Sequence, residues 1–248
     1  MLLFPNAKVN LGLNVLKRRE DGFHDLDTVF APVTSLCDAL ELVYADSFSI
    51  EVMNVQVEGT NLCEKAFRLM EKEFGIPPVH IIIYKNIPMG AGLGGGSSDA
   101  AFTISGLNQL FSLGLDKARM ASLAAELGSD CAFFIYNRPM AASGRGEVLR
   151  EIDLDLSGYE IRIVPQDVFV STKEAYAGAR PHIPELLSSQ VVKMPVDRWK
   201  DILVNDFEEQ IFAAHPEIAL AKQRLYDEGA VYAAMSGSGS SVFGLFSR

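Results

Sequence analysis

The feature that most constrains this chain is the stretch PMGAGLGGGSSDAA, from Pro88 to Ala101, which holds five of the chain's 20 glycines. The β-branched run VHIIIYKNIP precedes it and predicts a strand, and the residues SSDAAFTISGLNQLFSLG predict a helix. Glycine allows positive φ angles and lets several backbone N–H groups approach an anion closely. A helix that begins directly after such a loop adds the N–H groups of its first turn and the positive end of its dipole. Strand, loop and helix together predict a phosphate cradle, with a flexible turn or a tight packing site as the alternative.

Three common phosphate-binding motifs fit this loop poorly. GAGLGG is a literal G-x-G-x-x-G, the fingerprint of dinucleotide-binding folds. Such a fold needs a parallel strand after the helix, yet a second helical stretch, LDKARMASLAAELG, follows here. The loop lacks the Gly-Lys-Ser/Thr ending of a Walker motif, and no HRD or DFG sequence of protein kinases follows downstream. The loop therefore belongs to another class of phosphate-binding protein.

Composition narrows the classes of function further. With 248 residues, 48% of them hydrophobic and 22% charged, the chain is long enough for a large core in one or two domains. A net charge of -10, with no run of Lys or Arg longer than Lys17–Arg19, argues against a nucleic-acid partner. Three scattered cysteines predict a reducing compartment and show no zinc-ligand spacing with the four histidines. No segment has the pattern of a signal peptide or a membrane span, so we expect a cytoplasmic protein without a membrane partner.

Hydrophobic periodicity predicts the elements of the first part of the chain. Alternation over Ala7–Val15 predicts a strand with one buried face, which leaves Lys8 and Asn10 together on the polar face. Residues 39–53 predict further strands joined by a turn. Residues 61–75 predict a helix, with capping-box spacing at its start and a glycine at its end.

The remaining chain mixes strands and helices. Residues 131–152 predict strands around a Pro–Met turn. Beyond residue 155 the expected elements are a strand at 159–165, helices at 170–179, 196–215 and 216–229, and two strands around a second glycine loop at 230–246. The pattern predicts an α+β chain of two domains, residues 1–154 and residues 155–248.

The glycine stretch resembles the ATP-binding motif of the GHMP kinases, the superfamily of galactokinase, homoserine kinase, mevalonate kinase and phosphomevalonate kinase. Three further stretches resemble one branch, whose acceptor is an alcohol linked to cytidine diphosphate: AKVNLGLNVLKRREDGFHDLDTVF, LGSDCAFF and MSGSGSSVFGLF. These stretches run from Ala7 to Phe246 in the expected order. One departure is Ala132, which stands where the family commonly has a proline; Asp130 keeps its place.

The resemblance implies a two-domain GHMP kinase fold, with a ribosomal-protein-S5-like amino-terminal domain and a ferredoxin-like carboxy-terminal domain. It also implies a kinase that uses ATP and Mg²⁺ to phosphorylate a hydroxyl of a small-molecule acceptor in non-mevalonate isoprenoid biosynthesis, as a monomer or a homodimer. Two alternatives stay open at this point: another small-molecule GHMP kinase of the homoserine or mevalonate type, or a non-catalytic ligand sensor on the same fold.

Two charged residues are the catalytic candidates. Asp130 precedes the apolar run CAFFIY, where an unpaired carboxylate is costly, although a helix cap or a loop carboxylate is the ordinary alternative. Lys8 alone would be interpreted as a solvated strand lysine. The resemblance implies that Asp130 accepts the proton of the acceptor hydroxyl. It further implies that Lys8, beside this aspartate, keeps the carboxylate ionised and stabilises charge on the transferring group.

Aromatic and amide side chains are the candidates for binding the acceptor. From the residues alone, Phe23 is as readily a core ring and His24 a loop histidine. The resemblance implies that Phe23 stacks on the cytosine, His24 hydrogen-bonds its edge, Tyr176 covers the other face and Asn10 binds the acceptor. The second glycine loop is either a hairpin turn or, as the resemblance implies, faces the phosphates of both substrates. Its candidates are Ser236, Gly237, Ser238 and Gly239.

The first glycine loop supplies the candidates for binding the nucleotide. The hydroxyls of Ser97 and Ser98 add donors, and Ser98 is expected to reach Mg²⁺ or a β-phosphate. Asp99 would repel a triphosphate, so it is expected to be a helix-start residue that points away. The candidates for cofactor binding are Pro88, Met89, Gly90, Ala91, Gly92, Leu93, Gly94, Gly95, Gly96, Ser97 and Ser98.

Overall fold

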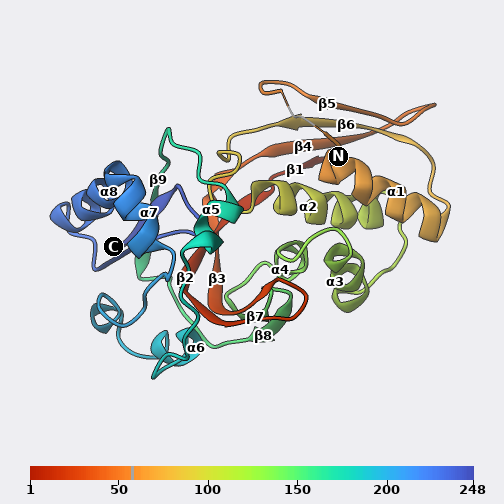
Figure 1. Ribbon diagram of the computed structural model, residues 1–248. Coiled ribbons are helices and arrows are strands. Elements are labelled where there is room, and N and C mark those ends of the chain that lie inside the picture. Colours follow the sequence, from red (N-terminus) through yellow and green to blue (C-terminus); the bar gives the residue numbers. More distant parts are fainter. Residues whose placement is uncertain (57–58) are drawn as a thin grey trace. The chain divides into compact units, whose positions relative to one another are not determined.

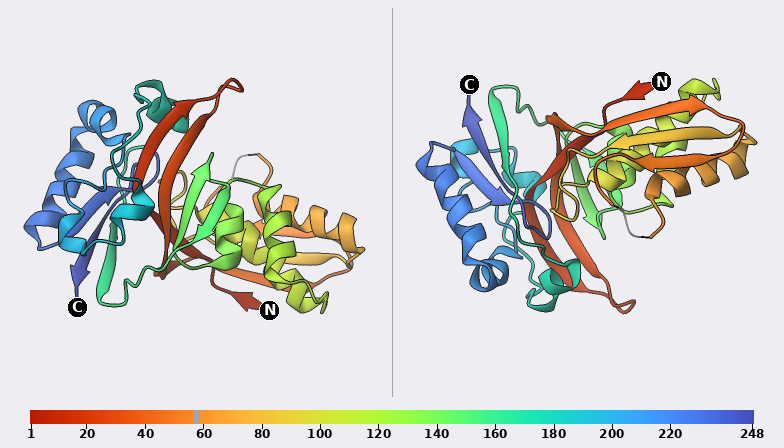
Figure 2. Two further views of the ribbon diagram at one scale, coloured as in Figure 1. Left: turned by 90° about the horizontal axis from the view of Figure 1, so that it is seen from below. Right: turned by 90° about the horizontal axis from the view of Figure 1, so that it is seen from above.

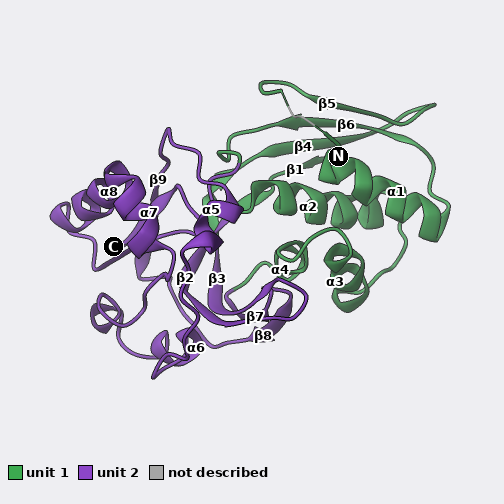
Figure 3. Cartoon of the chain, viewed as in Figure 1, with its two compact units in different colours: residues 1–7, 32–89, 94–138 green, residues 8–31, 90–93, 139–248 purple. Residues whose placement is uncertain are grey.

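The computed structural model describes residues 1–56 and 59–248, which form two compact units that each combine strands and helices (Figures 1 and 3). Unit 1 consists of residues 1–7, 32–89 and 94–138, and unit 2 of residues 8–31, 90–93 and 139–248. The α+β prediction is confirmed. The units draw on segments that are distant in sequence, and the domain division at residues 154 and 155 stays a prediction.

Unit 1 contains a four-stranded sheet in the order β1-β4-β6-β5. Its strands are β1 (Leu2–Leu3), β4 (Ala39–Tyr44), β6 (Val79–Tyr84) and β5 (Ser49–Val52). β5 runs parallel to β6, and the other neighbours are antiparallel. Leu40 and Leu42 lie opposite Ile83 and Ile81, and all four side chains are buried, as the alternation of a strand requires. The strands predicted within residues 39–53 are confirmed.

Helices cover one face of this sheet. The helices of unit 1 are α1 (Leu62–Phe74), α2 (Gly95–Leu110), α3 (Lys117–Ala125) and α4 (Cys131–Tyr136). α1 and α2 pack against each other along the sheet (Figures 1 and 2). As predicted, α1 begins at Asn61, whose side chain accepts a hydrogen bond from the Cys63 N–H, and ends at left-handed Gly75. A side chain on Gly106 would lie 2.6 Å from Leu3, so glycine lets α2 approach the sheet.

Helix α4 contradicts one prediction. Residues 131–136 were expected to form a strand, and this expectation is wrong because Cys131–Ile135 are buried in a helix. A short apolar run has no periodicity that separates a buried helix from a buried strand. The strands that follow are β7 (Met140–Gly144) and β8 (Val148–Glu151), and their turn spans residues 145–147 rather than the Pro–Met pair.

A second sheet has the order β2-β3-β7-β8, with β2 (Asn6–Arg18) and β3 (His24–Cys37) as its long strands. The prediction that β2 has a single buried face is wrong, because all residues from Asn6 to Val15 are buried. A later part of the chain covers the free edge of β2. The Leu13 N–H donates to the Val204 carbonyl and the Leu13 carbonyl accepts from the Asp206 N–H, both at 2.8 Å. Sequence periodicity does not detect such tertiary cover.

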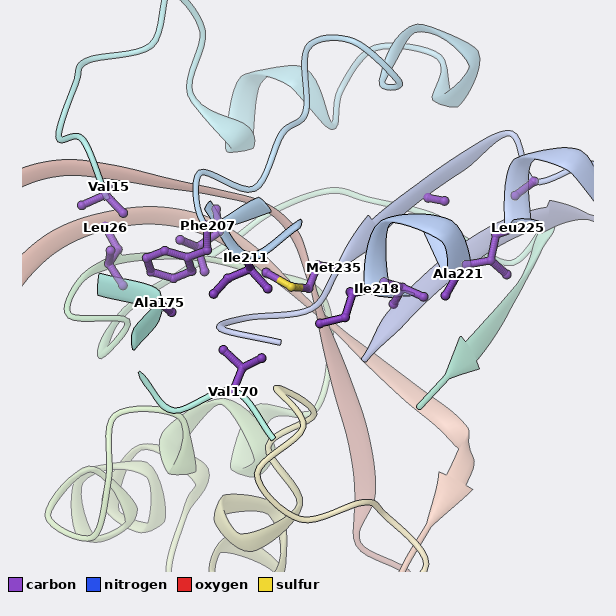
Figure 4. Packing of buried hydrophobic residues seen from close by; sticks show 14 of the residues in the cluster. Val15, Leu26, Val170, Ala175, Phe207, Ile211, Ile218, Ala221, Leu225 and Met235 are labelled. Carbon is purple, nitrogen blue, oxygen red and sulfur yellow. The ribbon is translucent and has the colours of Figure 1, made fainter. Parts of the chain in front are cut away.

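Unit 2 also contains a three-stranded antiparallel sheet in the order β10-β11-β9. Its strands are β9 (Tyr159–Val164), β10 (Tyr232–Met235) and β11 (Val242–Ser247), and α7 (Glu208–Ala214) and α8 (Pro216–Asp227) precede β10. α8 packs against β10 and β11. Figure 4 shows the hydrophobic core of unit 2, which includes Phe207, Ile211, Met235 and Leu225. The predicted strands and the helix at 216–229 are confirmed.

Shorter helices connect these elements. They are α5 (Thr172–Ala177), α6 (Ser188–Val191) and the 3₁₀ helix η1 (Val196–Arg198). α5 confirms the helix predicted at 170–179, whereas the continuous helix predicted at 196–215 is wrong. The chain leaves helical geometry after η1 because the backbone around Asn205 pairs with β2, and helix resumes only in α7. None of the helices in the described ranges is long and apolar enough to cross a bilayer.

Candidate active site

The first glycine loop alternates left-handed glycines with other residues. Gly90, Gly92 and Gly94 have φ angles of 66°, 77° and 72°, a region that residues with a side chain rarely adopt. A Cβ atom on Gly92 would clash with the carbonyl oxygen of Ser236 in the second glycine loop. Glycine is therefore needed at position 92 both for its backbone angle and for a close approach within unit 2.

Side chains of the loop differ in their exposure. Met89 and Gly90 are exposed and Pro88 is half-buried, whereas Ala91 and Leu93 are buried. We therefore expect Ala91 and Leu93 to contribute backbone groups and packing rather than side-chain contacts to a ligand.

Helix α2 begins directly after this loop. Gly94 is its left-handed N-cap and has no side chain to cap the helix. The first intrahelical bond runs from the Ser98 N–H to the Gly94 carbonyl at 2.9 Å. The N–H groups of Gly95, Gly96 and Ser97 precede this bond, and such groups have no intrahelical acceptor. Together with the dipole of a 16-residue helix, they form a site that suits an anion such as phosphate.

Ser98 is the candidate metal ligand, and its buried hydroxyl group could bind a ligand. The residue is 0% exposed, and its Oγ has no hydrogen-bond partner within the described residues. An unsatisfied buried hydroxyl is unfavourable, so a bound oxygen or cation at this helix end would satisfy it. In the part of the chain that the structure describes, no three His, Cys, Asp or Glu side chains are placed to hold a metal.

Asp99 is not a simple helix-start residue. It is 4% exposed, and its Oδ2 accepts a hydrogen bond from Lys85 Nζ at 2.6 Å. Lys85 Nζ also donates to Asp38, whose Oδ1 accepts from the N–H groups of Asn86 and Ile87 at 2.5 and 2.8 Å. The expectation that Asp99 acts at the helix start is therefore wrong, because it lies beyond the first turn of α2 and its carboxylate pairs with a buried lysine of the adjoining strand end. We call Lys85, Asp38 and Asp99 the Lys85 cluster.

The Lys85 cluster places two carboxylates on one ammonium group. Burial, with a further contribution from the neighbouring carboxylate of Asp38, raises the pKa of Asp99 to about 7. Burial alone would lower the pKa of Lys85, but the two carboxylates outweigh burial and raise it. The cluster links the end of β6, the entry to the glycine loop and the start of α2.

Lys8 and Asn10 lie on the same face of β2, as predicted, but both are buried. Lys8 is 4% exposed, and its Nζ donates to Asn10 Oδ1 at 2.6 Å and lies 5.0 Å from the centroid of the Phe30 ring. Asn10 Nδ2 donates to Thr28 Oγ1 at 3.0 Å. The Lys8 N–H donates to the Leu93 carbonyl at 2.9 Å, which attaches β2 to the first glycine loop. The interpretation of Lys8 as a solvated lysine is therefore wrong.

Asp130 occupies the N-cap position of α4 and is half-buried. Its side chain makes no capping hydrogen bond, so the ordinary helix-cap alternative does not explain it. Ala132 lies in the first turn of α4, where a proline would also fit. The departure from the family pattern at Ala132 is therefore compatible with the same local helix.

The aromatic candidates lie in unit 2. The rings of His24 and Tyr176 stack, with centroids 4.8 Å apart and planes inclined by 21°. Phe207 meets Tyr176 edge-on at 4.8 Å. Phe23 is 53% exposed, and the Arg145 guanidinium lies 4.8 Å from its ring centroid. The structure thus pairs His24 with Tyr176 and Phe23 with Arg145, and the placement of a base on Phe23 and Tyr176 stays a prediction.

The second glycine loop connects β10 and β11 and packs on the first. Ser236 Oγ donates to the Gly92 carbonyl at 2.9 Å. Gly237 and Gly239 have φ angles of 57° and 91°. Ser238 is half-buried, whereas its neighbours are buried. These contacts exceed what a plain hairpin turn requires, and they place the second glycine loop beside residues 90–93 of the first, within unit 2.

The sequence matches known proteins over its whole length. Residues 61–138 match the GHMP kinases N terminal domain, and residues 191–248 match the GHMP kinases C terminal domain. A 4-diphosphocytidyl-2-C-methyl-D-erythritol kinase of Bacteroides thetaiotaomicron is 52% identical, over 99% of this chain and 92% of that protein. This chain belongs to the 4-diphosphocytidyl-2-C-methyl-D-erythritol kinase family of GHMP kinases. The corresponding kinase of Cytophaga hutchinsonii is 44% identical, over 99% and 92% of the two chains.

Solved structures agree with this family. A crystal structure of 4-(cytidine 5'-diphospho)-2C-methyl-D-erythritol kinase has a TM-score of 0.84 and 35% identity, over 99% of this chain and 90% of that one. A mevalonate kinase has a TM-score of 0.73 at 13% identity, over 99% and 91% of the two chains, which shows a shared fold alone. The GHMP kinase fold is therefore confirmed and the chain is a kinase. The homoserine or mevalonate alternative and the sensor alternative are not favoured.

Sequence reasoning on this kinase missed two members of the Lys85 cluster. Lys85 did carry a signal, because it stands between the apolar run VHIIIY and the glycine loop, where a charged side chain needs a partner. Asp38 carried none, since its partner Lys85 lies 47 residues further along the chain.

Proposed function

We propose that this protein transfers the γ-phosphoryl group of ATP to the 2-hydroxyl of 4-diphosphocytidyl-2-C-methyl-D-erythritol in non-mevalonate isoprenoid biosynthesis. Near-full-length relatives named for this activity support the acceptor. The observation that supports phosphoryl transfer most directly is the start of α2, where left-handed Gly94, the first-turn N–H groups and the unsatisfied Ser98 hydroxyl occur together. In this proposal the enzyme acts on a small molecule in the cytoplasm, without nucleic acid or membrane, as a monomer or a homodimer.

Phosphate binding falls to backbone groups in this proposal. The N–H groups of Gly95, Gly96 and Ser97 would donate to phosphate oxygens, and the Ser98 hydroxyl would contact the β-phosphate or Mg²⁺. When bound, Mg²⁺ neutralises part of the phosphate charge and orients the nucleotide. The left-handed glycines of the loop keep side chains away from these donors.

Two side chains would act on the reacting groups. Asp130 would accept the proton of the acceptor hydroxyl, since an ionised carboxylate can serve as a general base and the stretch LGSDCAFF matches the family at this aspartate. Lys8 would stabilise negative charge on the transferring group. Its burial strengthens this effect, because a buried ammonium group is weakly screened by water.

Recognition of the acceptor would use the aromatic candidates and Asn10. Phe23 offers an exposed ring on which cytosine can stack, and His24 and Tyr176 are already stacked on each other. Asn10 would contact the acceptor beside Lys8, to which it is hydrogen-bonded. The second glycine loop, Ser236–Gly239, would face phosphate groups with its backbone N–H donors.

A kinetic panel tests this function. The protein is assayed with ATP and Mg²⁺ against 4-diphosphocytidyl-2-C-methyl-D-erythritol, its uridine counterpart, 2-C-methyl-D-erythritol 4-phosphate, homoserine and mevalonate. We expect kcat/KM to be highest for the cytidine compound by at least about a hundredfold over the acceptors without a base, since stacking and edge contacts both disappear. Equal or greater activity on homoserine or mevalonate would overturn the proposal.

A further inference from the structure

A single buried amide supports the second glycine loop from behind. Asn205 is 3% exposed. Its Nδ2 donates to the carbonyls of Met235 and Gly237, both at 2.8 Å, and its Oδ1 accepts from the Phe207 N–H at 3.0 Å. Both amide hydrogens and the amide oxygen are thus engaged with backbone, an arrangement that neither an acid nor a shorter side chain can reproduce.

The backbone of Asn205 is itself fixed to β2. Leu13 pairs with Asn205 through the backbone bonds of Val204 and Asp206, both at 2.8 Å. The Val15 N–H donates to Asp206 Oδ2 at 2.7 Å. The amide therefore has a defined position relative to β2, the strand that also bears Lys8 and Asn10.

Met235 is held on both of its backbone groups. Asn205 binds its carbonyl, and Glu208 Oε1 accepts from its N–H at 2.7 Å. Lys222 Nζ donates to Glu208 Oε2 at 2.6 Å and so orients that carboxylate. Phe207 and Met235 also pack in the same hydrophobic cluster (Figure 4). The end of β10 is thereby fixed just before the loop begins.

The fixed loop lies against Gly92 and against Asn10, the hydrogen-bond partner of Lys8. A side chain on Gly237 would lie 3.3 Å from the Gly92 carbonyl oxygen and 3.4 Å from Asn10 Oδ1. Asn10 Oδ1 in turn accepts from Lys8 Nζ at 2.6 Å. A shift of Gly237 of about 1 Å would therefore disturb both the first glycine loop and the partner of Lys8, and displacements of that size can cost about a hundredfold in rate.

We propose that Asn205 is a positioning residue of this kinase, which holds Met235 and Gly237 so that the second glycine loop sits correctly against Gly92 and Asn10. The catalytic importance of Asn205 rests on the proposed function, whereas its structural support of the second glycine loop does not. Asn205 would act through the loop backbone and touch neither substrate.

The test compares Asn205→Asp with a matched control, Asn108→Asp. Asn205→Asp preserves shape but replaces two donated hydrogen bonds by carboxylate–carbonyl repulsion. Asn108, near the end of α2, hydrogen-bonds both backbone groups of Leu115. Asn108 Nδ2 donates to the Leu115 carbonyl at 3.2 Å, and Asn108 Oδ1 accepts from the Leu115 N–H at 2.9 Å. The measurements are kcat and KM for each substrate, the midpoint of thermal unfolding, and amide hydrogen exchange of residues 235–241.

We expect Asn205→Asp to lower kcat/KM for the acceptor by about tenfold or more and to speed exchange in residues 235–241. Asn108→Asp should keep kcat/KM within about threefold of the parent and leave that exchange unchanged. Parent-like kinetics of a folded Asn205→Asp protein would overturn the proposal, and so would an equal loss in both variants. If the parent does not phosphorylate this acceptor, the proposed function fails. In that case amide hydrogen exchange alone tests whether Asn205 supports the second glycine loop. Unchanged exchange in Asn205→Asp would show that it does not.

Discussion

Asp130 stands at the start of a helix that its side chain does not cap, next to the fully buried Cys131. In the proposed function this carboxylate has the role of general base. The exposed ring of Phe23 is comparable, because an aromatic side chain that contributes little to the core has surface left for a ligand. Phe23 can therefore be replaced with limited cost to folding, which makes kinetics of its variants informative.

Replacing Asp130 by asparagine keeps its shape and removes the proton acceptor. General-base catalysis is worth about 10²–10⁴-fold, so kcat of Asp130→Asn should fall by that amount while calorimetry shows ATP affinity close to that of the parent. Asp116 is the control, since its side chain caps α3 by accepting from the Arg119 N–H and Asp116→Asn keeps that acceptor. More than half of the parent turnover in Asp130→Asn would rule out the assigned role.

Replacing Phe23 by alanine removes a stacking surface. A base stacked on an aromatic ring gains about 1–3 kcal/mol, so KM for the acceptor should rise about tenfold or more while KM for ATP stays constant. Phe4 is exposed to a similar extent, so Phe4→Ala controls for the loss of a surface ring and should leave both constants unchanged. A larger effect on ATP than on the acceptor would move Phe23 to the nucleotide site.

At the scale of elements, the two glycine loops and the start of α2 depend on specific packing behind them. Gly92 of the first glycine loop packs closely against Ser236 of the second. The Lys85 cluster holds the entry to the first loop and the beginning of α2 in place. The backbone proposed to bind phosphate is thus supported by close packing and by a buried ion pair, and each support predicts a separate change in stability.

Gly92→Ala should destabilise the fold, because alanine at φ +77° costs about 1–2 kcal/mol and its Cβ also meets the Ser236 carbonyl. Gly96→Ala is the matched control, since its Cβ would lie 3.8 Å from Leu62, an ordinary contact, inside a helix. Urea unfolding should show a loss of about 2 kcal/mol or more for Gly92→Ala and no loss for Gly96→Ala. Equal stability of the two variants would show that the loops tolerate separation.

The Lys85 cluster predicts a dependence of stability on pH. The pKa of Asp99 is about 7 in the folded protein and has an ordinary value of 3.8. Between these values the folded state binds more protons than the unfolded state, so stability from this group is greatest at low pH and falls as pH rises, by at most about 1.4 kcal/mol per pH unit. The raised pKa of Lys85 acts only above 10.5, outside this window.

Urea unfolding from pH 5 to pH 8 checks this behaviour. Asp99→Asn has no proton to lose at this position. The difference between its free energy of unfolding and that of the parent should therefore increase in favour of the variant as pH rises, and become constant above about pH 7. A difference between the two proteins that stays constant across this range would contradict the raised pKa.

Over the whole molecule, features coded by neighbouring residues could be predicted from the sequence and features that join distant segments could not. The caps of α1 at Asn61 and Gly75 are local, and so is the order of strand, glycine loop and α2. The burial of Lys8 depends on later segments that cover β2, and Asn205 reaches Met235 across 30 residues. Such contacts leave no periodicity in the sequence. The family motif supplied the candidate roles, but the structure revealed the buried network behind them.

The most direct test is ³¹P nuclear magnetic resonance of one reaction mixture containing the protein, ATP, Mg²⁺ and 4-diphosphocytidyl-2-C-methyl-D-erythritol. We predict that ADP and a new phosphomonoester signal appear in equal amounts, while the diphosphate signals of the cytidine compound persist. Consumption of ATP to free phosphate without a phosphomonoester, or no consumption of ATP by the folded protein, would contradict the proposal that this kinase phosphorylates the hydroxyl of that acceptor.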